Sequence, residues 1–80
     1  MKKYILMICV EREMWCMAVC DTKEDAWEIM KKDFLETINV EDVEFENNYA
    51  TDYDSWEIGP DSAWANDISG QNYDWKIVEV

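Results

Sequence analysis

The feature that most constrains the fold is an apolar stripe in residues 22–38. Trp27, Met30, Phe34 and Ile38 recur at spacings of three or four residues. That period places the four side chains on one face of an α-helix and leaves the remaining positions to solvent. We therefore expect one amphipathic helix here, with its apolar face packed against another element.

Signals for the start of this helix precede the stripe. Asp21 and Thr22 can each act as the N-cap, and acidic residues follow three positions after each of them, at Glu24 and Asp25. This spacing resembles a capping box, and acids in the first turn also interact favourably with the helix dipole. We expect the helix to run from about residue 22 to 38 and to end near Asn39.

Two apolar runs come before the helix. Residues 3–10 are continuously apolar and rich in residues that favour strands, which predicts a central strand covered on both faces. Residues 11–13, Glu-Arg-Glu, break the pattern, and residues 14–20 form a second predicted strand. The simplest arrangement of the two strands is a β-hairpin.

The second half predicts two more strands. One lies within residues 49–58 and ends at the turn signal Gly59-Pro60-Asp61, and the other covers residues 73–80. Residues 61–72 are expected to form a loop anchored by Trp64, or one short helical turn. The predicted order is ββαββ, an α+β fold in which one helix packs across one face of an antiparallel sheet. With 80 residues there is room for a single hydrophobic core, so residues 1–80 are expected to form one domain.

Negative charge is concentrated in the second half. Residues 1–38 carry eight acids and six bases, whereas residues 39–80 carry eleven acids and one base, Lys76. A field of this sign argues against direct binding to nucleic acid. The acids alternate with aromatic residues of the kind enriched at binding hot spots, namely Tyr49, Tyr53, Trp56, Trp64 and Tyr73.

This pattern predicts a binding surface for a basic partner. An acidic face with aromatic anchors would be steered onto a basic groove of the kind that normally holds nucleic acid, as in a nuclease. The candidate contact residues are Glu41, Asp42, Glu44, Glu46, Asp52, Tyr53, Asp54, Trp56 and Glu57. Two alternatives stay open: acidity that only keeps the protein soluble, and a small interaction or regulatory module that forms a homodimer.

The sequence lacks the residues that most kinds of catalysis require. There is no histidine to act as a base, and two glycines are too few for a phosphate-binding loop. Asp52-Tyr53-Asp54 resembles the start of a calcium loop but lacks the later glycine and glutamate. A sugar-cleaving carboxylate pair would need a cleft that nothing in the sequence indicates. We expect no enzyme activity, no catalytic residues, no metal and no cofactor.

The cysteines and the N-terminus favour a cytoplasmic protein. Cys9, Cys16 and Cys20 are an odd number without histidine, which fits reduced and mostly buried thiols better than a zinc site. The basic start at residues 1–3 and the apolar run after it resemble a signal peptide. That run is short, and residues 11–13 close it with charges instead of a cleavage site. No stretch is long enough to cross a membrane.

The whole chain resembles a class of small acidic proteins. Its Met-Lys-Lys-Tyr-Ile start, Ser62-Ala-Trp64 and residues 72–80 (Asn-Tyr-Asp-Trp-Lys-Ile-Val-Glu-Val) accompany the acidity and the ββαββ order. These features resemble small phage and mobile-element proteins of Gram-positive bacteria, including anti-CRISPR proteins. The resemblance implies an acidic mimic of nucleic acid that occupies the channel of a Cas effector or another nuclease.

Overall fold

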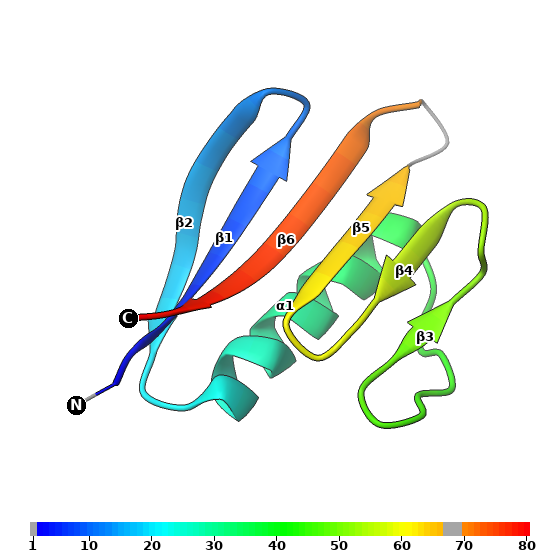
Figure 1. Ribbon diagram of the computed structural model, residues 1–80. Coiled ribbons are helices and arrows are strands. Elements are labelled where there is room, and N and C mark those ends of the chain that lie inside the picture. Colours follow the sequence, from blue (N-terminus) through cyan, green and yellow to red (C-terminus); the bar gives the residue numbers. More distant parts are fainter. Residues whose placement is uncertain (1, 67–69) are drawn as a thin grey trace.

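The computed structural model describes residues 2–66 and 70–80 and has an α+β fold (Figure 1). One helix lies across a six-stranded antiparallel sheet with the strand order β2-β1-β6-β5-β4-β3. In chain order the elements are β1 (Tyr4–Val10), β2 (Glu13–Cys20), α1 (Lys23–Ile38), β3 (Ala50–Thr51), β4 (Trp56–Ile58), β5 (Ser62–Asn66) and β6 (Asn72–Glu79). The fold class is as predicted, although four strands follow the helix where two were expected.

The helix begins and ends at the residues that its capping signals indicate. Thr22 is the N-cap, and its Oγ1 accepts a hydrogen bond of 3.1 Å from the backbone N–H of Asp25. Asn39 ends the helix in the left-handed conformation, with a φ of 60°, which asparagine tolerates better than most residues. The apolar stripe faces the sheet, where the buried helix residues are Ala26, Trp27, Met30, Phe34 and Leu35.

Aromatic side chains join the helix to the sheet. The ring of Phe34 is fully buried and lies edge-on to Trp56 and to Trp75, with a distance of 5.5 Å between ring centroids in each pair. The Trp75 indole N–H donates to Asp33 Oδ2 at 2.8 Å, so this buried ring keeps a polar partner. Such pairs bury large apolar areas and fix the position of the helix on the sheet.

Residues 62–66 were predicted to lie in a loop or a helical turn, and that prediction was wrong. They form β5, which pairs with β6 on one side and with β4 on the other. Ala63 and Ala65 point toward α1 and are buried, and their small size lets the helix approach the sheet closely. The single strand expected within residues 49–58 is instead the β3–β4 hairpin. The rest of the predicted loop includes residues 67–69, which lie outside the described residues.

The expectation that β1 is covered on both faces was also wrong. Leu6 and Ile8 are buried beneath α1, but Ile5, Met7 and Cys9 alternate to the opposite face and are only half-buried. No described segment packs over that face, which is the side of the sheet seen in Figure 1. The sheet therefore has one covered face and one open face.

The cysteines are less buried than their residue type predicts. Cys16 is exposed, Cys9 and Cys20 are half-buried, and all three are free thiols. Burial beside α1 and the nearby Asp25 and Asp21 raise the pKa of the Cys20 thiol.

Across residues 2–66 and 70–80, no helix is long and apolar enough to cross a membrane.

Candidate functional site

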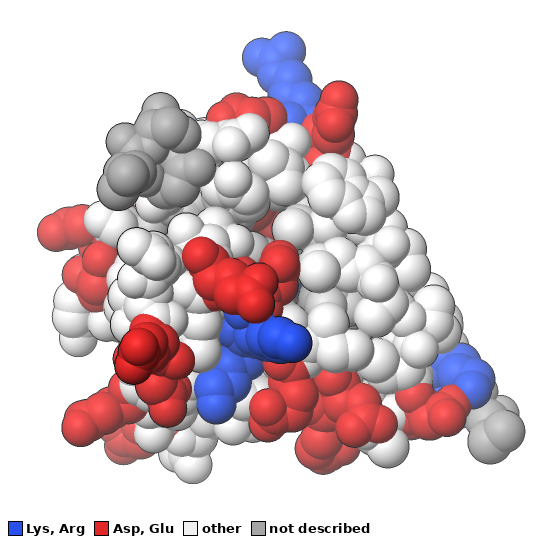
Figure 2. Space-filling view, turned by 180° about the vertical axis from the view of Figure 1, so that it is seen from behind, with Lys and Arg blue, Asp and Glu red and all other residues white. Residues whose placement is uncertain are grey.

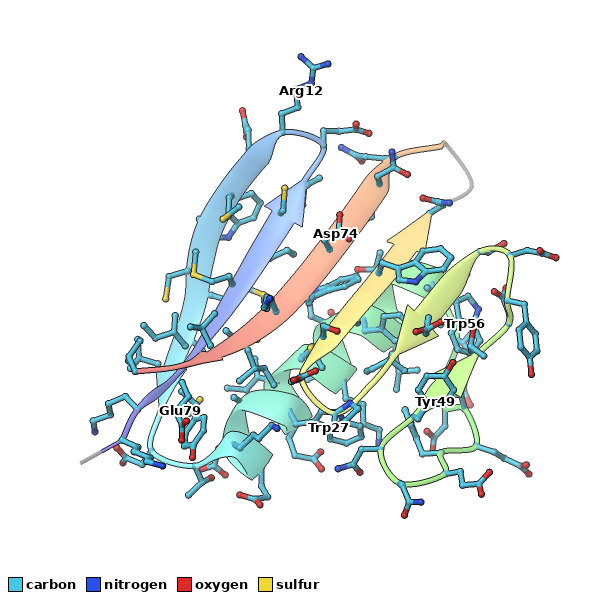
Figure 3. The ribbon with its side chains drawn as sticks, in the orientation of Figure 1. Arg12, Trp27, Tyr49, Trp56, Asp74 and Glu79 are labelled. Atoms are coloured by element: carbon cyan, nitrogen blue, oxygen red, sulfur yellow. The ribbon has the colours of Figure 1, made fainter. Side chains whose placement is uncertain are left out.

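The predicted contact residues lie along the β3 end of the sheet, in the loop that follows α1 and in the β3–β4 hairpin. Figure 3 shows Tyr49 and Trp56 on this side of the molecule, far from Arg12 at the tip of the β1–β2 hairpin. Six acids in these segments are exposed. Asp52 organises a turn described below, and we call the other five the acidic edge: Glu41, Asp42, Glu44, Glu46 and Asp54.

The loop after α1 is held against the helix by a small aromatic cluster. Phe45 packs edge-on to Trp27, with 5.3 Å between ring centroids. Lys31 Nζ lies 5.1 Å from the centre of the Phe45 ring and 5.6 Å from that of Trp27, which is the geometry of a cation–π interaction. Because Phe45 is anchored inward, Glu44 and Glu46 on either side of it remain exposed.

The turn of the β3–β4 hairpin is organised by Asp52. Its Oδ1 accepts hydrogen bonds from the backbone N–H groups of Asp54, Ser55 and Trp56, at 3.1, 2.7 and 2.9 Å. Tyr53 lies at the tip of the turn with a φ of 73° and is 85% exposed. Asp52, which is also a predicted contact residue, thus has one carboxylate oxygen bound inside the turn.

Asp52 makes the stability of the hairpin depend on pH. Partial loss of water around the carboxyl group acts to raise its pKa, but the three backbone hydrogen bonds outweigh this effect and lower the pKa. A lowered pKa in the folded state means that the ionised group stabilises the fold above its ordinary pKa. That contribution is lost as the pH falls through the folded-state pKa.

We therefore expect Asp52→Asn to be less stable than the wild type at pH 7, and the difference to be smaller at about pH 2, where a larger share of the Asp52 carboxyl groups is protonated. Urea unfolding at the two pH values measures it. Asp54→Asn is the matched control, because the Asp54 carboxylate accepts no hydrogen bond within the described part of the chain. A stability difference for Asp52→Asn that is the same at both pH values would show that the charge plays no part.

The aromatic residues of this region divide into two groups. Trp56 packs against Phe34 in the core, so its ring supports the fold, and Trp64 and Tyr73 are half-buried. Tyr49 and Tyr53 are exposed. Partial desolvation, followed by the nearby carboxylate of Glu57, raises the pKa of Tyr49, which keeps the phenol protonated and able to donate. The accessible aromatic anchors are thus the two tyrosines.

The segment that carries the acidic edge contains no basic residue to neutralise its charge. Residues 39–66 contain no Lys or Arg. Within the described residues there are two salt bridges, Lys2 with Glu79 at 3.2 Å and Lys3 with Asp21, and both lie at the other end of the sheet. Figure 2 shows acidic side chains spread over the α1 side, and a broad uncharged area over the back of the β1–β2 hairpin. The negative field of the acidic edge therefore projects into solvent.

The same carboxylates are not arranged as a metal site. The described ranges contain no group of three or more Asp, Glu, Cys or His side chains placed to hold an ion. A polar hollow of about 690 Å³ lies between the end of α1 and the hairpin, and its one carboxylate is Asp52. Acid–base cleavage of a sugar uses a pair of carboxylates, and the described lining of this hollow provides one.

The sequence interpretation missed the open face of the sheet as a candidate surface. Met14 and Val19, on the edge strand β2, are 66% and 61% exposed. The available signal was that residues 3–10 and 14–20 are apolar on both of their alternating sides, while the sequence predicts a single helix to cover them. Comparison with protein-family models, with curated proteins and with solved structures gave no match for this chain.

Proposed function

We propose that this protein is a binding protein without enzyme activity that inhibits a nucleic-acid-binding protein. It docks the acidic edge into a basic groove of a Cas effector or another nuclease in the cytoplasm, as an anti-CRISPR-like mimic of nucleic acid. The observation that carries the proposal is the row of exposed carboxylates at residues 41–46 and 54, in a stretch of 28 residues without a base. Such a surface is steered toward positive charge and repels nucleic acid.

The anchoring of the two segments supports this role. Phe45 against Trp27 holds the first segment, and the Asp52 turn holds the second, so the carboxylates are presented on an ordered backbone. A surface that is ordered before binding loses less conformational entropy when it docks. The exposed Tyr53 beside Asp54 adds an aromatic anchor next to a charge.

The dependence of binding on salt tests the proposal. Purified Cas effectors loaded with guide RNA, together with other basic nucleases, form the panel, and calorimetry measures binding at 50 and 300 mM NaCl. We expect at least one member to bind at low salt, with an affinity that falls at least about tenfold at high salt, because several close charge pairs are screened. If no member binds at 50 mM NaCl, or if affinity is independent of salt, the acidic edge has no such partner.

A further inference from the structure

The face of the sheet opposite α1 carries a continuous apolar surface. Residues paired directly across adjacent strands point to the same side of a sheet, so the strand registers define which side chains share this face. From β2 through β1 to β6 they form three rows: Met14–Cys9–Asp74, Cys16–Met7–Lys76 and Val19–Ile5–Val78. We call these nine residues the open face.

The open face is exposed and hollowed. A depression of about 420 Å³ lies over β1, β6 and β5, and Met7, Cys9, Met14 and Trp64 line it together with Asp74 and Lys76. Met14 and Val19 project into solvent, and no described element covers them. Contiguous apolar surfaces of this kind mark interaction sites.

The charge on the open face is balanced, unlike that of the chain as a whole. Asp74 and Lys76 are its two charged residues, and they stand two positions apart on β6, about 6.6 Å along the strand. Both residues are exposed, and neither makes a salt bridge with any described residue. Figure 3 shows Asp74 near the middle of β6, on the side of the sheet that faces the viewer.

We infer that the open face binds a second copy of this chain, face to face about a twofold axis. A twofold interface joins a surface to itself, so each charge on it needs its opposite on the same surface. An acid and a base on neighbouring rows meet that need, because Asp74 can pair with Lys76 of the second copy and Lys76 with Asp74 of the second copy. This inference does not depend on the proposed function, since the open face and the acidic edge lie at opposite ends of the strand order.

The size of the surface and the placement of the acids fit this arrangement. The open face and the depression next to it extend over β2, β1, β6 and β5. Four strands of about seven residues span roughly 19 by 23 Å, or about 440 Å² before side-chain relief is counted, which is the scale of the smaller specific interfaces, at under about 600 Å² per partner. The acidic edge lies at the β3 end, away from β2, β1 and β6. At physiological salt the screening length is about 8 Å, so repulsion between the acidic edges of the two copies is weak.

Sedimentation equilibrium over a range of concentrations tests the dimer. We expect a species of twice the 9.6 kDa chain mass at micromolar concentrations. Met14→Lys combined with Val19→Lys should weaken dimerisation at least about 100-fold, because it buries unpaired ammonium groups in both copies. A wild-type protein that stays monomeric at every concentration would overturn the inference.

Trp15→Lys is the matched control for face-to-face packing. Trp15 lies on the same strand between exposed residues and is 46% exposed, but it pairs with Ile8 and so points to the α1 side. Face-to-face packing predicts that this variant still forms dimers, whereas pairing of two β2 edges would place Trp15 in the interface. A monomeric Trp15→Lys with an unchanged circular dichroism spectrum would therefore contradict the packing we infer.

Exchange of the two charges tests the pairing itself. Asp74→Lys alone and Lys76→Asp alone each place like charges opposite one another, and each should weaken the homodimer at least about tenfold. An equimolar mixture of the two variants should recover association as a heterodimer, because every unlike pair is then restored. Full-strength homodimers of either variant, or a mixture that associates no better than its components, would rule out the reciprocal pairs.

Discussion

Replacement of Phe34 by alanine is expected to remove a large part of the free energy of unfolding of the protein at 25 °C. Phe34 is fully buried and contacts both Trp56 and Trp75 edge-on, so its loss opens a cavity between α1 and the sheet. Removal of a buried phenylalanine side chain costs about 3–5 kcal/mol. A domain of this length has a total stability of roughly 4–12 kcal/mol. Urea unfolding followed by circular dichroism measures the loss.

Ile29→Ala provides the control for this prediction. Ile29 lies on the same helix but faces solvent, so its truncation should cost less than about 1 kcal/mol. Equal losses for the two variants would mean that the aromatic contacts do not fix the helix on the sheet.

Reversal of the charges at Glu41, Asp42, Glu44 and Glu46 to lysine is expected to abolish partner binding. The four changes turn a net charge of −12 into −4 and invert the local field. We expect the affinity for the nuclease that binds best to fall at least about 100-fold, because close charge pairs across an interface couple by more than about 1.5 kcal/mol each. Folding should be retained because all four residues are exposed. Calorimetry at 50 mM NaCl measures the change.

Two double variants distinguish the effect of where the charges lie from the effect of the net charge. Glu44→Lys with Glu46→Lys, and Glu13→Lys with Glu28→Lys, change the net charge by the same amount at different places. Glu13 begins β2 at the β1–β2 turn and Glu28 is an exposed residue of α1, and neither belongs to the acidic edge. We expect only the first double variant to lose most of its binding. Equal losses would mean that total acidity, which solubility alone can explain, accounts for the attraction.

Local signals predicted the helix and the long strands well. Thr22 and Asn39 cap α1 where the sequence indicates, and Leu6 and Ile8 face the core. The strand β5 was missed because Ala63 and Ala65 have little intrinsic preference for strands. Their conformation is decided by pairing with β6, which lies further along the chain. Pairing with a neighbouring strand cannot be predicted from residues 62–66 alone.

The negative charge of the candidate site could be predicted from the sequence, but the different roles of its carboxylates could not. The eleven acids after residue 38 are plain in the sequence, yet nothing there separates Asp52, whose Oδ1 binds the turn, from Asp54, whose carboxylate does not. That difference depends on backbone geometry.

The apolar residues of β1 led to the prediction that both of its faces are covered. No part of this chain described by the structure packs over the second face. A sequence pattern alone does not distinguish burial within a chain from burial between chains.

Competition with nucleic acid tests the central claim most directly. A fluorescent DNA substrate is bound to the nuclease that the protein binds, and the protein is titrated in at several fixed DNA concentrations above the dissociation constant of the DNA. If the acidic edge occupies the nucleic-acid groove, DNA is displaced and the midpoint of displacement rises in proportion to the DNA concentration. Formation of a ternary complex, with a midpoint that does not depend on the DNA concentration, would contradict the account.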